Sequence, residues 1–214
     1  MIGNIVKRSV KTTIGLFIYS FGVYLTICAN IGLAPWDCLS MGISAKTMIS
    51  YGIVHTITSI IVLAIDPLLG EKIGIGSILD ALLVGNFIDF FRFLDIVPTD
   101  KGLIFGIVIM VIGLFICAWG QFFYMSAGLG CGPRDSLFVG LGKRVKAVPI
   151  GVVQIGVLGV VLLIGWLLGG PVGIGTVITT FGTGTAIQIV FNALKFEPRN
   201  VEHKDVIETI RMCH

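Results

Sequence analysis

Two short motifs in this sequence place a proline and an aspartate two residues apart: Pro35-Trp36-Asp37 and Pro133-Arg134-Asp135. Proline is favoured in the first turn of a helix, where its missing N–H would have no partner in any case. The aspartate falls in the same turn, where the positive end of the helix dipole favours a carboxylate. Both motifs therefore predict the start of a helix.

The middle residue differs between the motifs, Trp36 in the first and Arg134 in the second. Arginine can hold an acid group through two hydrogen bonds, and tryptophan offers a face to an apolar or cationic group. We therefore predict that Trp36, Asp37, Arg134 and Asp135 bind a small anionic or zwitterionic solute. Two alternatives stay open: membrane-surface helices that their aspartates cap, and an Arg134 that belongs to the basic cluster 143–146.

Asp80 is the second candidate, near the middle of the apolar stretch Ile73–Leu94. A carboxylate at the centre of a bilayer costs about 2.5 to 3.5 kcal/mol, so its presence needs a reason. We predict that Asp80 couples transport to a proton or to the solute, with a hydrogen-bonded packing role as the alternative. Asp89 lies near the end of the stretch and is expected to be solvated. His55 and Gln154 are single polar residues near span ends, and nothing further follows from them.

The two motifs belong to an internal duplication. A shift of 98 residues places Gly22 on Gly120, and a shift of 99 places Gly52 on Gly151. The same shifts align Gly32-Leu33-Ala34-Pro35-Trp36-Asp37 with Gly130-Cys131-Gly132-Pro133-Arg134-Asp135, and Gly74-Ile75-Gly76-Ser77 with Gly173-Ile174-Gly175-Thr176. A single change of register over about seventy residues indicates two related halves, because shared composition would not keep these positions in order.

The composition excludes a soluble protein. Hydrophobic residues make up 55% of the 214 residues and charged residues 13%, with a mean hydropathy of +0.99. Soluble domains carry about 25% charged residues. The chain is therefore predicted to be an integral membrane protein whose main partner is the lipid bilayer.

Small residues are predicted to serve packing. The glycines expected to allow close helix approach are Gly74, Gly76, Gly173, Gly175, Gly182 and Gly184. The five cysteines show no CxxC spacing and are expected to pack as small apolar residues. No metal site and no cofactor is predicted.

Six apolar stretches are candidate membrane spans: Thr12–Asn30, Tyr51–Leu69, Ile73–Leu94, Leu103–Tyr124, Val148–Leu168 and Val172–Leu194. With cytoplasmic N- and C-termini, most of the 15 Lys and Arg residues lie on the inner side, as the positive-inside rule requires. Counting both motif segments as crossings gives eight spans and an equally good charge distribution. Length favours six, because the 12 residues from Pro35 to Lys46 make about 18 Å of helix against a core of about 30 Å.

An odd number of spans in each half reverses the second copy in the membrane. The predicted fold is therefore an all-α membrane protein with six transmembrane helices, arranged as two inverted three-helix repeats. Each repeat has a short half-helix after its first span. The expected boundaries are 1–101 and 102–195 for the repeats and 196–214 for a cytoplasmic tail, with a short helix in Lys204–Met212.

The sequence resembles the YczE/YitT-type family of bacterial multi-spanning membrane proteins. The resemblance covers nearly all of the chain except the tail, and rests on both motifs and on Gly165-Trp166-Leu167-Leu168-Gly169-Gly170-Pro171-Val172-Gly173-Ile174-Gly175-Thr176. It implies a protein of the bacterial cytoplasmic membrane, in a family whose activity is largely unassigned. It supports the topology and supplies no substrate.

Two functions from different classes remain. The first is a small secondary transporter or exporter with a midplane site between the repeats. A variant of it is a six-span vitamin-binding subunit of a larger transporter, although an internal duplication is not expected in such a subunit. The second is an accessory protein that supports a membrane-associated enzyme without transporting anything. An enzyme is not expected, because the sequence has no nucleophile elbow, HExxH motif or phosphate loop. Nucleic acid is not an expected partner, and a homo-oligomer is compatible with the sequence.

Overall fold

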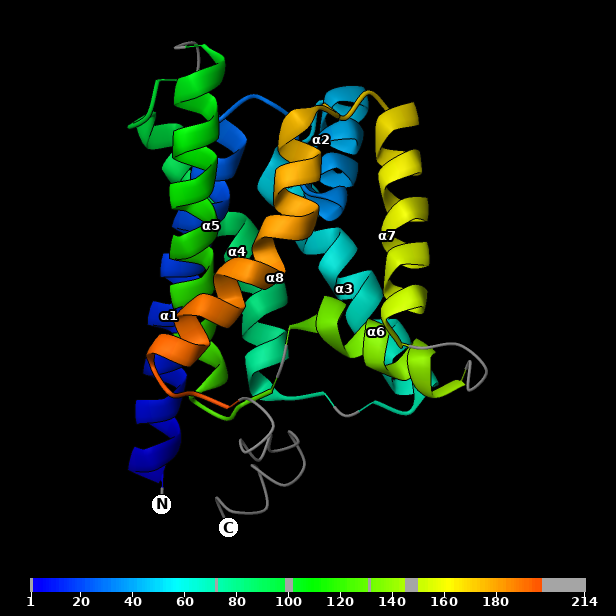
Figure 1. The fold of residues 1–214 in the computed structure, drawn as a ribbon. Helices are drawn as coiled ribbons and strands as arrows, with labels where there is room; N and C mark the ends of the chain where they lie inside the picture. The colour runs from blue at the N-terminus through cyan, green and yellow to red at the C-terminus, as the bar shows by residue number, and fades with distance from the viewer. Residues whose placement is uncertain (1, 72, 99–101, 131, 145–149, 198–214) are drawn as a thin grey trace.

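The computed structural model describes residues 2–71, 73–98, 102–130, 132–144 and 150–197 (Figure 1). In these ranges the chain forms helices and no strands. The helices are α1 Ile2–Cys28, α2 Pro35–Thr47, α3 Tyr51–Leu69, α4 Ile75–Leu94, α5 Leu103–Met125, α6 Pro133–Arg144, α7 Ile150–Leu167 and α8 Ile174–Ala193. The predicted all-α class is confirmed.

Four of these helices are long and apolar enough to cross a membrane. They are the Ile5–Cys28 part of α1, α3, α5 and α8. The other two predicted spans fall short for different reasons. Helix α4 has 20 residues but includes Asp80, Asp89 and Arg92, and the apolar part of α7, Gly151–Leu167, is one turn shorter than α8. The number of crossings thus stays a prediction.

Helices α1 and α5 pack together along a contact made by glycines. A Cβ atom added to Gly22 would lie 2.6 Å from the backbone nitrogen of Cys117, and one added to Gly113 would lie 2.8 Å from the Gly22 oxygen. At the other end of the contact, a Cβ on Gly120 would lie 2.8 Å from the Gly15 oxygen. No side chain fits at these positions, so the glycines set how closely the two helices approach.

The first turns of α4 and α8 each donate a backbone hydrogen bond to a loop in the other half of the sequence. The Gly76 N–H at the start of α4 donates to the Leu129 carbonyl at 2.7 Å, and the Gly175 N–H at the start of α8 donates to the Ile31 carbonyl at 2.7 Å. Gly32, beside Ile31, has φ +115°, which only glycine adopts readily. The prediction of close approach is confirmed for Gly76 and Gly175, with backbone loops as the neighbours.

The short helices α2 and α6 lie at opposite ends of the molecule (Figure 1). Helix α2 packs on α7, and α6 packs on α3. A Cβ on Gly42 would lie 2.6 Å from the Gly165 oxygen, and one on Gly140 would lie 2.8 Å from the Leu69 Cβ. Each short helix therefore packs on a long helix of the other half of the sequence.

Several sequence expectations need correction. Asp80 is the sixth residue of α4 rather than a middle one, because the hydrogen bond of Gly76 fixes the start of that helix. Asp89 is not simply solvated, since its Oδ1 accepts a hydrogen bond from the Gly52 N–H at 2.9 Å. Gly184 has no neighbour within 4 Å of an added Cβ, so its predicted close contact is wrong for this conformation.

Other expectations are confirmed or fall outside the described residues. Cys28, Cys38 and Cys117 are buried free thiols, as predicted for packing residues. Cys131, Cys213 and the helix expected in Lys204–Met212 lie outside the described residues.

Candidate functional site

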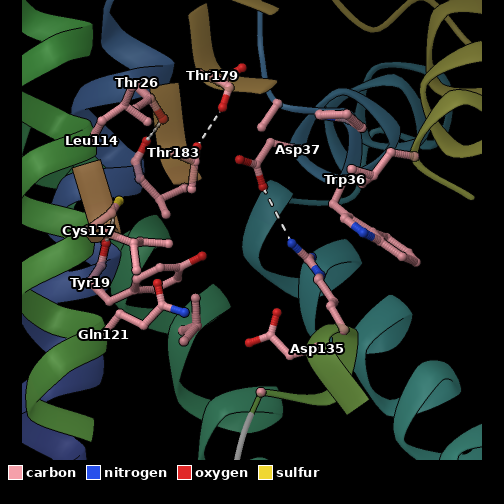
Figure 2. Close-up of a pocket in the computed structure, with 18 of the residues that line it drawn as sticks. Tyr19, Thr26, Trp36, Asp37, Leu114, Cys117, Gln121, Asp135, Thr179 and Thr183 are labelled. Atoms are coloured by element: carbon pink, nitrogen blue, oxygen red, sulfur yellow. Dashed lines mark hydrogen bonds and ion pairs between the residues drawn. The ribbon is translucent and has the colours of Figure 1, made fainter. Parts of the chain in front are cut away.

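A cavity of about 340 Å³ lies where the two short helices begin. Every residue singled out by sequence for binding or coupling lines it: Trp36, Asp37, Asp80, Arg134 and Asp135. Figure 2 shows Trp36, Asp37 and Asp135 on one side, and Tyr19, Cys117 and Gln121 of α1 and α5 on the other. Residues about a hundred positions apart in the sequence therefore meet at one site.

Helices α2 and α6 begin at Pro35 and Pro133, as the motifs predicted. Ala34, before α2, has the extended backbone of an N-cap residue, with φ −60° and ψ 152°. Asp37 and Asp135 both fall in the first turn. The N-terminal ends of both helices thus face the cavity, where their free N–H groups create a positive region.

Asp37 has one hydrogen-bond partner and one ion-pair partner. The Tyr51 hydroxyl donates to its Oδ1 at 2.8 Å. The Arg134 Nη1 lies 3.7 Å from the same oxygen, an ion pair drawn as the dashed line at Asp37 in Figure 2. Tyr51 is fully buried at the start of α3. A neutral and a charged partner together compensate much of the cost of burying this carboxylate.

Arg134 also stacks on Trp36. The guanidinium carbon lies 5.1 Å from the centroid of the indole ring, within the range of a cation–π interaction. Arg134 therefore lies in the cavity wall and not with Arg144, whose guanidinium contacts the Leu68 carbonyl. Residues 145 and 146 of the basic cluster lie outside the described residues, so the alternative in which Arg134 belongs to that cluster stays open.

Three buried donors or acceptors around this cavity have no hydrogen-bond partner among the described residues. They are Trp36 Nε1, His55 Nδ1 and Arg134 Nη2. Buried polar atoms in native proteins nearly always have a partner, so an unpaired group at a cavity indicates a place for water or a ligand. Two of the three are obligatory donors and suit the oxygens of an acid group.

Asp80 and Asp135 form an acidic side of the cavity. A Cβ atom added to Gly132 would lie 3.5 Å from the Asp80 Oδ2, 3.6 Å from the Asp135 Oδ2 and 3.8 Å from the Tyr124 hydroxyl. Three oxygens thus surround the space that glycine leaves free. Neither carboxylate has a hydrogen bond or ion pair within the described part of the chain, whereas Asp37 has both.

The cavity also contains polar side chains that were not predicted from the sequence to bind or couple a solute. His55 of α3 and Gln154 of α7 occupy equivalent positions, and both line it. Thr179 and Thr183 line it from α8, and their hydroxyls donate to the carbonyls of Gly175 and Thr179 at 2.9 and 2.6 Å. The spacing of four residues between polar groups in α8 was the available signal, because it puts them on one helix face.

No group of three or more His, Cys, Asp or Glu side chains within the described ranges is arranged to hold a metal ion. The three aspartates of the cavity are therefore not arranged as a common metal site. What the arrangement offers is one guanidinium, three carboxylates and several neutral donors around a space that fits a small solute.

A family model described as a family of unknown function, DUF6198, matches residues 6–192. The chain is a member of the DUF6198 family. It is 32% identical over 176 residues to the uncharacterized membrane protein YczE of Bacillus subtilis (strain 168). The aligned residues cover 81% of this chain and 80% of that protein. The predicted resemblance to YczE-type proteins is confirmed.

Two further relatives align with most of this DUF6198 chain. An uncharacterized protein of Haemophilus influenzae (strain ATCC 51907 / DSM 11121 / KW20 / Rd) is 31% identical over 84% of this chain and 81% of its own. The uncharacterized protein YyaS of Bacillus subtilis (strain 168) is 28% identical over 82% of this chain and 88% of its own. No solved structure matches the chain. With the apolar helices, these relatives support an integral membrane protein.

Proposed function

We propose that this DUF6198 protein is a secondary transporter or exporter of a small zwitterionic solute, with the cavity as its binding site. The observation that carries the proposal is the meeting of two helix N-termini, from equivalent motifs, at one charged cavity. Interrupted helices at matching places in two repeats are typical of the midplane sites of secondary transporters.

An inverted repeat accounts for the contacts between the halves. Gly15 pairs with Gly120 and Gly22 pairs with Gly113, and the 98-residue shift converts each pair into the other. Such an exchange is what a two-fold axis produces at an interface between equivalent elements. The Cys117 thiol, 3.6 Å from the carbonyl of its own equivalent Tyr19, fits a position on that axis. The hydrogen bonds of Gly76 and Gly175 are exchanged in the same way.

Helix lengths support six crossings. Helices α2 and α6 have 13 and 12 residues, or about 20 and 18 Å, which is short of a hydrocarbon core of about 30 Å. Helix α4, with 20 residues, is about 30 Å long in spite of its charges. The start of α1 and the end of α8 lie on the same side of the molecule (Figure 1). We place that side in the bacterial cytoplasm, because the basic residues gather there under the six-span topology.

A zwitterion uses both ends of the cavity. Its acid group would accept hydrogen bonds from Arg134 Nη2 and Trp36 Nε1, the two buried donors that lack partners. Its cationic group would lie between Asp80 and Asp135, in the space beside Gly132. A simple anion suits the cavity less well, since three carboxylates line it against one guanidinium.

Asp80 is the group proposed to couple transport to protons. It lies on the acidic side of the cavity with no ion pair among the described residues, so its charge can be neutralised by a proton or by the solute. A carboxylate that alternates between these two partners links the movement of one to the movement of the other.

The proposal is tested by the purified protein alone. Thermal shift in detergent, with amino acids and betaines as probes, should reveal a zwitterion that raises the melting temperature, whereas amines and acids of the same size should have less effect. The same zwitterion should cross liposome membranes only when the protein is present. Binding without flux, or neither, would favour the alternative of an accessory protein that supports a membrane-associated enzyme.

A further inference from the structure

The two halves of the molecule differ at one helix contact. In the first half α3 packs along α4, whereas α7 and α8 diverge from their connection (Figure 1) and share no comparable contact. The α3–α4 contact depends on Gly52 and Gly85, where a Cβ added to either would collide with the carbonyl of the other. A Cβ on Gly85 would also lie 2.8 Å from the Thr56 hydroxyl.

The second half keeps both glycines without the contact. The 99-residue shift that aligns these spans converts Gly52 into Gly151 and Gly85 into Gly184, and neither has a neighbour among the described residues within 4 Å of an added Cβ. Glycine inside a helix costs about 1 kcal/mol relative to alanine, and interfaces between membrane helices are enriched in such small residues. Two glycines at matched positions therefore indicate a contact that this conformation does not contain.

The exposed surface around these glycines is the open side of the cavity. His55, one turn after Gly52 on α3, is buried, but its equivalent Gln154 on α7 is exposed and lines the cavity. Thr180 and Gly184 of α8 are likewise both exposed and part of the cavity wall. Solvent or lipid thus reaches the cavity between α7 and α8.

We propose that the gap between α7 and α8 is the entrance to the cavity, and that the two helices close it by packing Gly151 against Gly184. The closed arrangement is the one that Gly52 and Gly85 adopt in the first half. Closure goes beyond the proposed transport function, because it can be measured without any solute.

The contacts of α7 fit a helix that pivots. Near its C-terminal end, a Cβ on Gly165 would lie 2.6 Å from the Leu39 nitrogen, so this end of α7 packs closely against α2. Nearer its start, an added Cβ on Gly151, Gly156 or Gly159 would meet no described atom within 4 Å, although α7 also contacts α6. The start of α7 therefore has room to move while its end stays held.

Disulfide trapping tests closure in membranes. In a background with the five native cysteines replaced by alanine, Ile155→Cys is combined with Thr180→Cys and oxidised with copper phenanthroline. The equivalents of these positions are Thr56, which contacts Gly85, and Ala81, one turn from Gly85 on the same face of α4. We expect an intramolecular disulfide to accumulate, because oxidation traps the closed state each time it forms.

The variant Gly184→Leu distinguishes a disulfide that forms through closure from one that forms through chance collisions of the two cysteines. Gly184→Leu has room in the open conformation but would overpack the closed one, so the trapping rate should fall by about tenfold or more. The matched controls are Gly156→Ile and Gly159→Ile, which copy the outward-facing Ile57 and Ile60 of α3 and should leave the rate within about twofold.

Three outcomes would overturn closure: no disulfide in correctly inserted protein, a trapping rate that Gly184→Leu leaves unchanged, or a disulfide between two copies in the single variant Ile155→Cys. The last would indicate that a second copy covers this face. Trapping that behaves as expected in a protein that moves no solute would leave closure standing and remove the transport function instead.

Discussion

The guanidinium carbon of Arg134 lies 5.1 Å from the centre of the Trp36 ring, although the two residues occupy the same position in the two copies of one motif. The two equivalent helix starts thus carry different side chains, which contact each other. The neighbouring residues Asp37 and Asp135 are both aspartates, and the pair Arg134 and Trp36 gives the cavity wall one cation and one aromatic face.

Exchange of Arg134 for lysine should remove most solute affinity. Lysine keeps the charge but loses the fork that can hold an acid group while stacking on an indole. We expect Arg134→Lys to weaken binding by about tenfold or more, since a hydrogen bond to a charged group contributes about 1.5 to 3 kcal/mol. Thermal shift titration of the best zwitterion measures this. Unchanged affinity in a correctly inserted variant would tell against the binding role.

Removal of the Tyr51 hydroxyl should destabilise the protein through Asp37. Tyr51→Phe deletes the 2.8 Å hydrogen bond and should cost about 1 to 3 kcal/mol, because a carboxylate in a buried setting loses a donor. The double variant Tyr51→Phe with Asp37→Asn should lose less than the sum of the two single variants. Thermal unfolding in detergent measures all three, and strict additivity would contradict the coupling.

Bulk at the α1–α5 contact should prevent folding. Gly22→Leu forces a side chain against the backbone of Cys117 and should cost about 3 kcal/mol or more. Gly156→Leu is the matched control, because its added atoms meet open space. Size-exclusion profiles of the expressed variants report the difference. Equal profiles for both would contradict the role of glycine at this contact.

Labelling distinguishes six crossings from eight. Under the inverted arrangement, single cysteines at Ser44 and Lys143 should react with a membrane-impermeant maleimide from opposite sides of the cell membrane, outside for Ser44 and inside for Lys143. Parallel repeats with eight crossings would make both react from the same side. This experiment reports on topology directly, because each position lies in the last turn of one of the two short helices.

Neutralising Asp80 should remove the pH dependence of flux. Asp80→Asn keeps the size of the side chain but cannot take up a proton, so any flux that remains should be the same at acidic and neutral pH. Thr179, its equivalent on α8, bonds to a helix carbonyl, and Thr179→Val is the matched control with pH dependence retained. A pH profile of Asp80→Asn that matches the unmodified protein would exclude the coupling role.

The sequence predicted those features of the fold and of the candidate site that local chemistry decides. Pro35 and Pro133 mark the helix starts because proline and aspartate favour the first turn in any context. The duplication predicted that both starts would be related. Asp80 and Asp135 could be expected to lie near each other once both halves were taken to surround a single cavity.

Features that depend on helix rotation and tertiary packing could not be predicted. His55 and Gln154 line the cavity because of the rotation of α3 and α7 about their axes. A single polar residue in an apolar stretch does not predict that rotation. The open space beside Gly184 depends on the distance between α7 and α8. A glycine in the sequence indicates that close approach is allowed, and it does not indicate when the approach occurs.

The central claim is that the cavity between the halves binds a zwitterion and carries it across the membrane. The most direct test is uptake of the zwitterion that shifts the melting temperature most, into sealed liposomes containing purified protein whose insertion is checked by the Ser44 and Lys143 labels. We predict saturable uptake that Arg134→Lys and Asp135→Asn each reduce by about tenfold or more, because each removes one end of the binding site. Saturable uptake that both variants retain, or no uptake of any bound zwitterion, would contradict the account.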